Sequence, residues 1–229
     1  MIEKPAPGER DRFWTAPRDG LSSPRISEEE IVGTLARAAC YKDQETPLHS
    51  TRMACYCAIL AHHLGLSAEA CSDIRLAATL HDIGKVGLRD DVLQNRGVLT
   101  EEERRHMTEH TRIGHAILSG ARSRVMRLAA VIALSHHEKW DGTGYPEGAK
   151  GQDIPLAGRI AAVADVFDAL TSVRSYKSAW TLSNAFHYLH QQAGSQFDPA
   201  CVAAFALGAD EIAAVMTMLP DHAEGAHAA

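Results

Sequence analysis

The sequence predicts an all-α fold. Apolar residues recur at helical spacing along most of the chain, Ser and Thr stand at positions that cap helices, and no run of strand length alternates apolar with polar residues. A chain of 229 residues with 45% hydrophobic residues can bury one sizeable core. We therefore expect one helical domain over residues 27–219, with an irregular, proline-rich arm before it (1–26) and a disordered tail after it (220–229).

Capping residues, prolines and glycines mark the expected elements. Ser27 with Glu30, three residues on, forms a capping box before the first helix, and Thr100 begins a second such box. Residues 84–99 and 139–155 are rich in glycine and are expected to be loops. The expected helices cover residues 27–41, 47–65, 67–82, 100–118, 125–134, 155–173, 182–193, 199–207 and 210–219.

Charge and cysteine content exclude several classes of function. The 23 Lys and Arg residues against 29 Asp and Glu residues give a net charge of −6, so binding to long nucleic acid by bulk electrostatics is not expected. The five cysteines show no pairing pattern, which favours small core residues in a reducing cytoplasm. No run approaches the roughly 18 apolar residues of a membrane span, and the first ten residues do not form a signal peptide.

Several polar residues that can bind metal interrupt or end apolar helical segments. They are His81, Asp82, His110, His136, His137, Asp165 and Asp168. Each one alone has a structural alternative, as a satisfied core histidine or a helix cap. Together they would be costly to bury without partners, and a divalent cation removes that cost. The set favours a centre of more than one ion, with Fe or Mn preferred over Zn because histidine and carboxylate ligands in this number suit octahedral geometry.

Two segments of this chain resemble a known family. They are His81-Asp82 and His136-His137-Glu138-Lys139-Trp140-Asp141-Gly142-Thr143-Gly144-Tyr145-Pro146. The second resembles the signature of the HD-GYP family, a branch of the HD-domain phosphohydrolases that cleaves the bacterial messenger cyclic di-GMP. The resemblance extends from about residue 27 to residue 207. It implies an HD-domain helical bundle with a Gly-Tyr-Pro loop and extra C-terminal helices.

The resemblance also implies a set of metal ligands. They are Glu45, His49, His81, Asp82, His110, His136, His137 and Asp165. A Glu four residues before the first His is typical of family members with three metal ions, so three ions are expected here rather than two. The alternative for Glu45 is a solvated carboxylate that precedes a helix.

Further residues are implied in catalysis and substrate binding. Lys85, Arg174 and Lys177 are expected to contact the phosphates, since a cation aimed at phosphate stabilises its charge. Gly144 and Tyr145 are expected to shape the wall of the binding site. Asp82, Lys85 and Asp168 are the expected catalytic residues, Asp168 by holding a neighbouring ligand or a basic side chain. The nucleophile is expected to be water activated by the metal ions.

The expected function is therefore a metal-dependent phosphodiesterase of bacterial signalling that hydrolyses cyclic di-GMP to linear pGpG, with further hydrolysis to GMP as an option. Two alternatives stay open. One is an HD phosphohydrolase of another nucleotide or cyclic dinucleotide. The other is a catalytically silent module that binds the ligand, or binds a diguanylate cyclase through the Gly-Tyr-Pro loop. A homodimer and a cytoplasmic location, without membrane contact, complete the expectation.

Overall fold

The computed structural model describes residues 27–42, 47–95, 97–173 and 179–220. Within these ranges the regular elements are helices, and one isolated bridge joins Ala193 to Phe197. The α-helices are α1 (Glu28–Lys42), α2 (Pro47–His63), α3 (Ala68–Ala78), α4 (Asp90–Leu93), α5 (Glu101–Thr108), α6 (His110–Leu118), α7 (Arg124–Ser135), α8 (Leu156–Thr171), α9 (Leu182–Gln191), α10 (Pro199–Leu207) and α11 (Ala209–Met218). Two 3-10 helices, η2 (Ile83–Gly87) and η3 (Gly151–Asp153), lie between them. The all-α prediction is confirmed.

Helix α2 lies at the centre of the core and packs against α3, α8, α10 and α11. Met53, Tyr56 and Leu60 follow one another at helical spacing along α2, and all three are fully buried. The Tyr56 ring meets Phe167 of α8 edge-on, with 5.2 Å between ring centroids. Phe167 in turn meets Phe205 of α10 at 5.0 Å. Aromatic packing therefore ties the C-terminal helices to the central pair α2 and α8.

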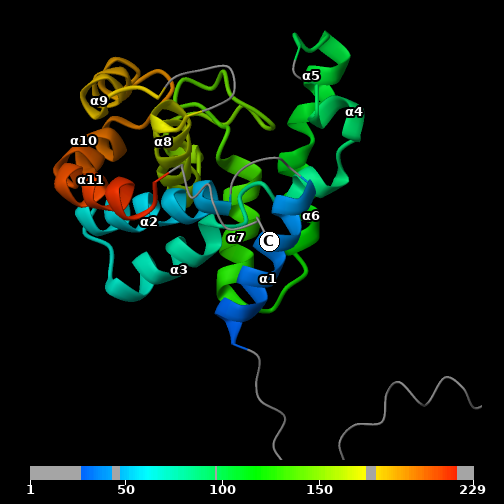
Figure 1. Cartoon of the computed structure of the whole chain (residues 1–229), viewed down its shortest axis with the longest axis horizontal. Coiled ribbons are helices and arrows are strands. Elements are labelled where there is room, and N and C mark those ends of the chain that lie inside the picture. Colours follow the sequence, from blue (N-terminus) through cyan, green and yellow to red (C-terminus); the bar gives the residue numbers. More distant parts are fainter. Residues whose placement is uncertain (1–26, 43–46, 96, 174–178, 221–229) are drawn as a thin grey trace, which may run out of the picture.

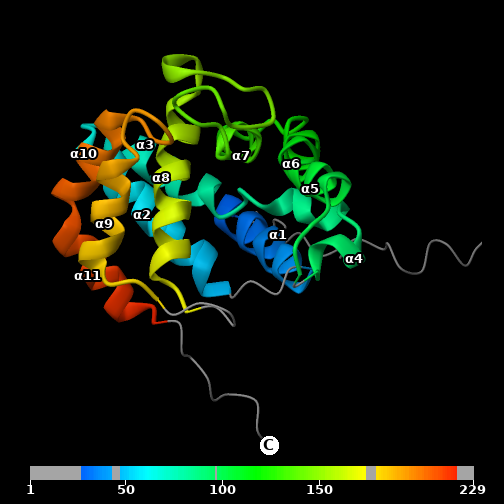
Figure 2. The ribbon, with the colours of Figure 1, turned by 90° about the horizontal axis from the view of Figure 1, so that it is seen from above.

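The helices around α2 and α8 are grouped toward two ends of the molecule. Helices α9, α10 and α11 are grouped at one end of the molecule, and α4, α5 and α6 at the other (Figures 1 and 2). Helix α7 connects the two sides, because it packs against α3, α6 and α8. The long connection between α7 and α8 leaves the end of α7 and carries the Gly-Tyr-Pro sequence (Figure 2). The ends of α3, α6 and α7 are thereby brought near α2 and α8.

The helix predicted over residues 100–118 is two helices, because the chain breaks at Glu109. The Thr108 hydroxyl donates to Arg105 O at 2.8 Å, and Nδ1 of His110 donates to Met107 O at 2.7 Å. Side chains that bond nearby carbonyls compete with the helical hydrogen bonds of the backbone. The break makes His110 the first residue of a new helix.

The helix predicted over residues 67–82 ends earlier, at Ala78. The Thr79 hydroxyl donates to Leu76 O at 2.7 Å, and Nδ1 of His81 donates to Ala78 O at 3.0 Å. The same competition between side chain and backbone therefore ends this helix just before the His-Asp pair.

The predicted loop over residues 84–99 contains the short helices η2 and α4. Gly84 allows the start of η2 to approach α6 closely. A Cβ atom at Gly84 would lie 1.9 Å from His110 O, so the η2 backbone packs directly on the start of α6 and has no room for a side chain. The expected arm and tail lie outside the described residues, apart from Pro220.

Candidate metal centre

Two adjoining groups of side chains could each hold a metal ion. One group is Asp82, His110, His136 and His137, and the other is His49, His81 and Asp165. Within each group the candidate ligand atoms lie within 4.8 Å of one another. Every expected ligand that falls in the described residues belongs to one of the groups. Glu45 lies outside the described residues.

Asp82 connects the two groups. Its Oδ1 lies 3.3 Å from Nε2 of His110 and 3.6 Å from Nε2 of His136, while its Oδ2 lies 3.2 Å from Nε2 of His81. One carboxylate thus faces histidines of both groups. This geometry suits a bridging ligand, since each carboxylate oxygen can bind a different cation.

Helix ends supply most of these side chains. His81 and Asp82 follow α3, His110 begins α6, and His136 caps the end of α7. His49 lies in the first turn of α2, and Asp165 lies within α8. The breaks after Ala78 and at Glu109 therefore have a direct consequence, because they turn His81 and His110 toward the same point.

Hydrogen bonds to backbone carbonyls fix the orientation of three histidines. Nδ1 of His81 donates to Ala78 O at 3.0 Å, Nδ1 of His110 donates to Met107 O at 2.7 Å, and Nδ1 of His136 donates to Ile132 O at 3.0 Å. A carbonyl can only accept, so Nδ1 carries the proton in each case. Nε2 of the neutral ring then holds the lone pair that a metal ion binds.

The residues present fit a divalent cation. Burial lowers the pKa of His110 to about 4, which keeps its ring neutral at pH 7 although Asp82 acts in the opposite direction. Burial also lowers the pKa of His137 well below its usual range. Oδ1 of Asp82 is buried and accepts no hydrogen bond from the described residues. Lone pairs of neutral imidazoles thus face a carboxylate, and a cation between them removes the repulsion.

Lys85 forms an ion pair with Asp82. Its Nζ lies 2.7 Å from Oδ2 of Asp82, and its side chain is largely buried. Burial alone would raise the pKa of Asp82, but the positive charge of Lys85 holds it well below the usual range. Asp82 is therefore a carboxylate anion, the form in which a carboxyl group binds a metal ion.

Asp168 lies behind His49 and belongs to neither group. Nδ1 of His49 donates to Oδ2 of Asp168 at 2.7 Å, while Nε2 of His49 faces Oδ1 of Asp165 at 3.6 Å. Burial would raise the pKa of Asp168, but hydrogen bonds from His49 and Arg52 lower it further than burial raises it. A carboxylate behind a histidine ligand is a common arrangement in metal sites, because it orients the ring and strengthens it as a donor.

The Gly-Tyr-Pro turn forms one wall beside the centre. The Tyr145 ring stacks on His137, with 4.8 Å between centroids and 30° between planes. A Cβ atom at Gly144 would lie 2.3 Å from Lys139 N, so the two arms of the turn touch there. The Tyr145–Pro146 peptide bond is cis. Gly144 and Tyr145 thus lie where the expected wall of the binding site would be.

Glu138 fixes this turn, a role that the sequence reasoning did not assign. Its side chain is buried, and its two oxygens accept hydrogen bonds from Glu147 N at 2.7 Å and Ala149 N at 3.0 Å. Arg112 supports the same turn by donating to Pro146 O at 3.0 Å. The available signal was a carboxylate directly after two histidine ligands and before a glycine-rich loop.

Four further residues concern the site: two expected phosphate contacts and two residues that the sequence did not predict. The expected phosphate contacts Arg174 and Lys177 lie outside the described residues. Arg52 and Ser172, which sequence reasoning did not assign, both bond Asp168. Their only sequence signal is weak, since Arg52 lies three residues after a predicted ligand and Ser172 four residues after Asp168.

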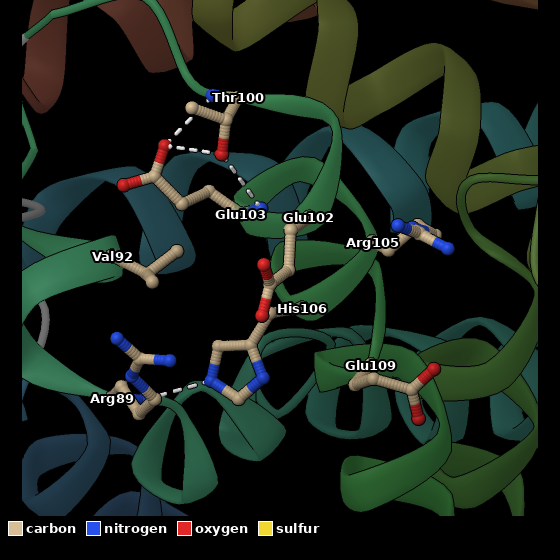
Figure 3. A pocket seen from close by; sticks show the side chains of 8 residues that line it. All are labelled: Arg89, Val92, Thr100, Glu102, Glu103, Arg105, His106 and Glu109. Atoms are coloured by element: carbon tan, nitrogen blue, oxygen red, sulfur yellow. Dashed lines mark hydrogen bonds between the residues drawn. The ribbon is translucent and has the colours of Figure 1, made fainter.

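A separate cavity of about 660 Å³ opens beside α5 (Figure 3). It is lined by Arg89, Val92, Thr100, Glu102, Glu103, Arg105, His106 and Glu109, none of which belongs to either group. In Figure 3 the Thr100 hydroxyl accepts from Glu103 N and the Glu103 carboxylate accepts from Thr100 N, which confirms the second capping box. His106 accepts from Arg89 N at 3.1 Å. The bond of His106 joins α5 to the start of α4, and the bonds of Thr100 and Glu103 lie within the start of α5.

The sequence is similar to a known family and to several curated proteins. The family model described as HD domain matches residues 33–201. The chain is 49% identical over 181 residues to the cyclic di-GMP phosphodiesterase response regulator RpfG of Xanthomonas campestris pv. campestris, covering 79% of this chain and 48% of that protein. It is 43% identical over 197 residues to the 3'3'-cGAMP-specific phosphodiesterase 2 of Vibrio cholerae, covering 86% of this chain and 38% of that protein.

Solved structures share the fold. A protein of Bdellovibrio bacteriovorus described as HDG"Y"P matches with a TM-score of 0.56 and 17% identity, over 77% of this chain and 60% of that one. The chain belongs to the HD domain family, and within it to the HD-GYP type that the Gly144-Tyr145-Pro146 sequence indicated. It spans about half the length, or less, of the curated relatives that it matches.

Within the described residues, no single helix is both long and apolar enough to cross a membrane. The pair α10 and α11, bent by 69° at its junction, reaches that length and composition only when its members are taken together.

Proposed function

We propose that this chain is a metal-dependent phosphodiesterase that hydrolyses cyclic di-GMP to linear pGpG. One observation carries the proposal: two groups of candidate histidine and carboxylate ligands adjoin each other, and the half-buried anion Asp82 faces histidines of both. Two cations held side by side suit a phosphodiester, because both the attacking and the leaving oxygen need stabilisation. The similarity to the cyclic di-GMP phosphodiesterase RpfG supports the choice of substrate.

The residues that would hold the ions are those of the two groups, with Glu45 added for a third ion. Bound divalent ions would supply an activated water and would stabilise negative charge on the phosphate. We propose Fe or Mn in preference to Zn, since a set rich in histidine and carboxylate favours six-coordinate ions.

The chain's own side chains would do the remaining work. Lys85, with its ammonium beside Asp82, would hold a phosphate oxygen close to the centre. Tyr145, stacked on His137, would form an apolar wall against which a nucleotide packs. Burial raises the pKa of the Tyr145 hydroxyl, so this side chain stays neutral and can donate a hydrogen bond. Arg174 and Lys177 would add charge toward the second phosphate.

A second candidate substrate is 3'3'-cGAMP. The similarity to the 3'3'-cGAMP-specific phosphodiesterase 2 of Vibrio cholerae favours it, over an even larger share of this chain. The two substrates differ in one base, so the metal groups alone do not separate them.

A substrate panel tests the proposal. Protein purified without oxygen and loaded with Fe²⁺ or Mn²⁺ would be incubated with cyclic di-GMP, 3'3'-cGAMP and cyclic di-AMP, and the products separated by chromatography. We expect the highest kcat/KM for cyclic di-GMP, and pGpG as the first product. A higher value for 3'3'-cGAMP would favour the second candidate. Binding of cyclic di-GMP without turnover of any substrate would favour a silent module.

Several finer expectations stay predictions. They are further hydrolysis to GMP, contact with a diguanylate cyclase through the Gly-Tyr-Pro loop, a homodimer, a cytoplasmic location and the domain bounds 27–219.

A further inference from the structure

Arg52 is a buried arginine directly behind the metal centre. It lies on α2 one turn after His49, and only 4% of its side chain is exposed. Its Nε donates to Oδ1 of Asp168 at 2.6 Å, and one terminal nitrogen donates to Oδ2 of Asp168 at 2.8 Å. This is the two-point pairing that a guanidinium makes with a carboxylate, and it fixes the plane of the Asp168 side chain.

The Asp168 carboxylate, whose plane Arg52 fixes, also bonds the His49 ring. Oδ2 of Asp168 accepts from Nδ1 of His49 at 2.7 Å, so the plane that Arg52 sets also sets the direction of the His49 ring. The other nitrogen of that ring, Nε2, faces Asp165 in the second ligand group. Arg52 bonds Asp168, Ser172 and the carbonyl of Leu219, and it acts on the His49 ring through Asp168.

We propose that Arg52 is a positioning residue that builds one ligand group selectively. Through Asp168 it holds His49 in the orientation that binds a cation in the His49–His81–Asp165 group. It has no corresponding role in the Asp82–His110–His136–His137 group, in which backbone carbonyls orient His110 and His136. The inference rests on the proposed metal centre, and its test separates the two.

Ser172 belongs to the same arrangement. Its hydroxyl donates to Oδ2 of Asp168 at 3.0 Å and lies 2.7 Å from a terminal nitrogen of Arg52. Ser172 is the residue directly after the last residue of α8. The remaining terminal nitrogen of Arg52 donates to Leu219 O at 3.3 Å, at the end of α11. Arg52 therefore joins α2, α8 and α11 at the one point where a histidine ligand needs support.

The experiment is a Mn²⁺ titration of metal-free protein without oxygen, followed by anomalous diffraction to give the occupancy of each group. Arg52→Lys keeps the charge but loses the planar fork. We expect the Mn²⁺ affinity of the His49–His81–Asp165 group to fall by about 10–100-fold, the range typical when the support of a ligand is removed. The affinity of the other group should stay unchanged.

The chain offers a matched control in Arg159. It pairs with Asp198 at 2.7 Å, with side chains 16% and 5% exposed, and Asp198 is not a candidate ligand. Arg159→Lys should leave both Mn²⁺ affinities unchanged. Ser172→Ala is a milder second variant that removes one hydrogen bond to Asp168, and it should weaken the same group to a smaller degree.

The outcomes are distinct. Equal loss in both groups for Arg52→Lys, or no loss in Arg52→Lys and Ser172→Ala, would overturn the inference while leaving the metal centre intact. Absence of Mn²⁺ from both groups of the wild-type protein would overturn the proposed centre and the role of Arg52 with it. If Arg52→Lys does not fold, as judged by circular dichroism, Ser172→Ala decides alone.

Discussion

Asp82 is the residue on which the two ligand groups depend. Its two oxygens face histidines of different groups, at 3.2 Å to His81 and 3.3 Å to His110. Removing it would take away the candidate ligand that faces both groups and the negative charge that would balance part of the charge of the bound cations. The loss would therefore be larger than the loss of one ordinary ligand.

The double variant His81→Ala, Asp82→Ala should lose cyclic di-GMP hydrolysis by more than about 100-fold, because metal ions supply several kcal/mol of charge stabilisation in such reactions. The helical fold should remain, as measured by circular dichroism. The control is His63→Ala, Glu211→Ala, a His–carboxylate pair at 2.7 Å outside both groups, which should keep its activity. Turnover near the wild-type rate in the first variant would contradict the assignment.

We predict that Glu45 decides the number of ions. We expect three divalent ions per chain in the wild-type protein, because a carboxylate neutralises part of the charge of an added dication. Glu45→Ala should retain two. Elemental analysis of both proteins, purified without oxygen, measures the difference. Two ions in the fully loaded wild-type protein, with no further loss in the variant, would show that Glu45 is not a ligand.

Single residues were partly predictable from the sequence. His and Asp residues at helix ends indicated most members of the two groups, and the resemblance added His49, while their role as metal ligands stays a prediction. Arg52 and Glu138 were not predictable, because their partners are set by tertiary packing. Arg52 bonds a carboxylate on another helix, and Glu138 bonds backbone amides of the next loop. No local periodicity carries that information.

At the scale of elements, side chains that bond backbone carbonyls decide where helices end. Nδ1 of His81 donates a hydrogen bond to Ala78 O after α3, and Nδ1 of His110 donates one to Met107 O between α5 and α6. Apolar periodicity predicted that these segments are helical but could not predict the breaks. Whether a histidine bonds solvent or a backbone carbonyl depends on the packing of the assembled site. The expected loop over residues 84–99 contained helices for the same reason, since Gly84 packs on α6 only in the folded chain.

The cap of α5 gives a pH-dependent prediction. Hydrogen bonds from Thr100 lower the pKa of Glu103. The unfolded-state pKa is about 4.3, so the stabilisation is present above that pH and is lost as the pH falls through the lower folded-state value. Thr100→Ala should reduce the free energy of unfolding by about 1 kcal/mol at pH 7. Urea denaturation at pH 7 and at acid pH checks this, and a loss that persists undiminished when Glu103 is protonated would contradict the reciprocal cap.

The turn after α7 gives another prediction. Glu138→Gln replaces one acceptor with an amide that points at a backbone N–H, so we expect a loss of about 1–3 kcal/mol in the free energy of unfolding. The KM for cyclic di-GMP should rise with Tyr145 displaced, while the metal content stays unchanged. Glu147→Gln in the same turn is the control, since the Glu147 side chain is more than half exposed. Metal loss in Glu138→Gln would assign Glu138 to the centre itself.

At the scale of the whole molecule, the fold brings together residues from five helices or their ends. Helices α2 and α8 form the interior and carry His49 and Asp165, while α3, α6 and α7 contribute from their ends. The all-α class and most helices followed from the sequence, because periodicity and capping are local. The packing that places Asp82 between the two groups is a property of the assembled bundle, and the sequence did not predict it.

The most direct test of the account is anomalous diffraction from crystals of the wild-type protein prepared without oxygen. Data collected at the Fe and Mn edges locate each ion and identify it. We predict one ion in each group, with Asp82 between the two, and a third ion beside Glu45. Strong binding of metal elsewhere, with both groups empty in protein that hydrolyses cyclic di-GMP, would contradict it.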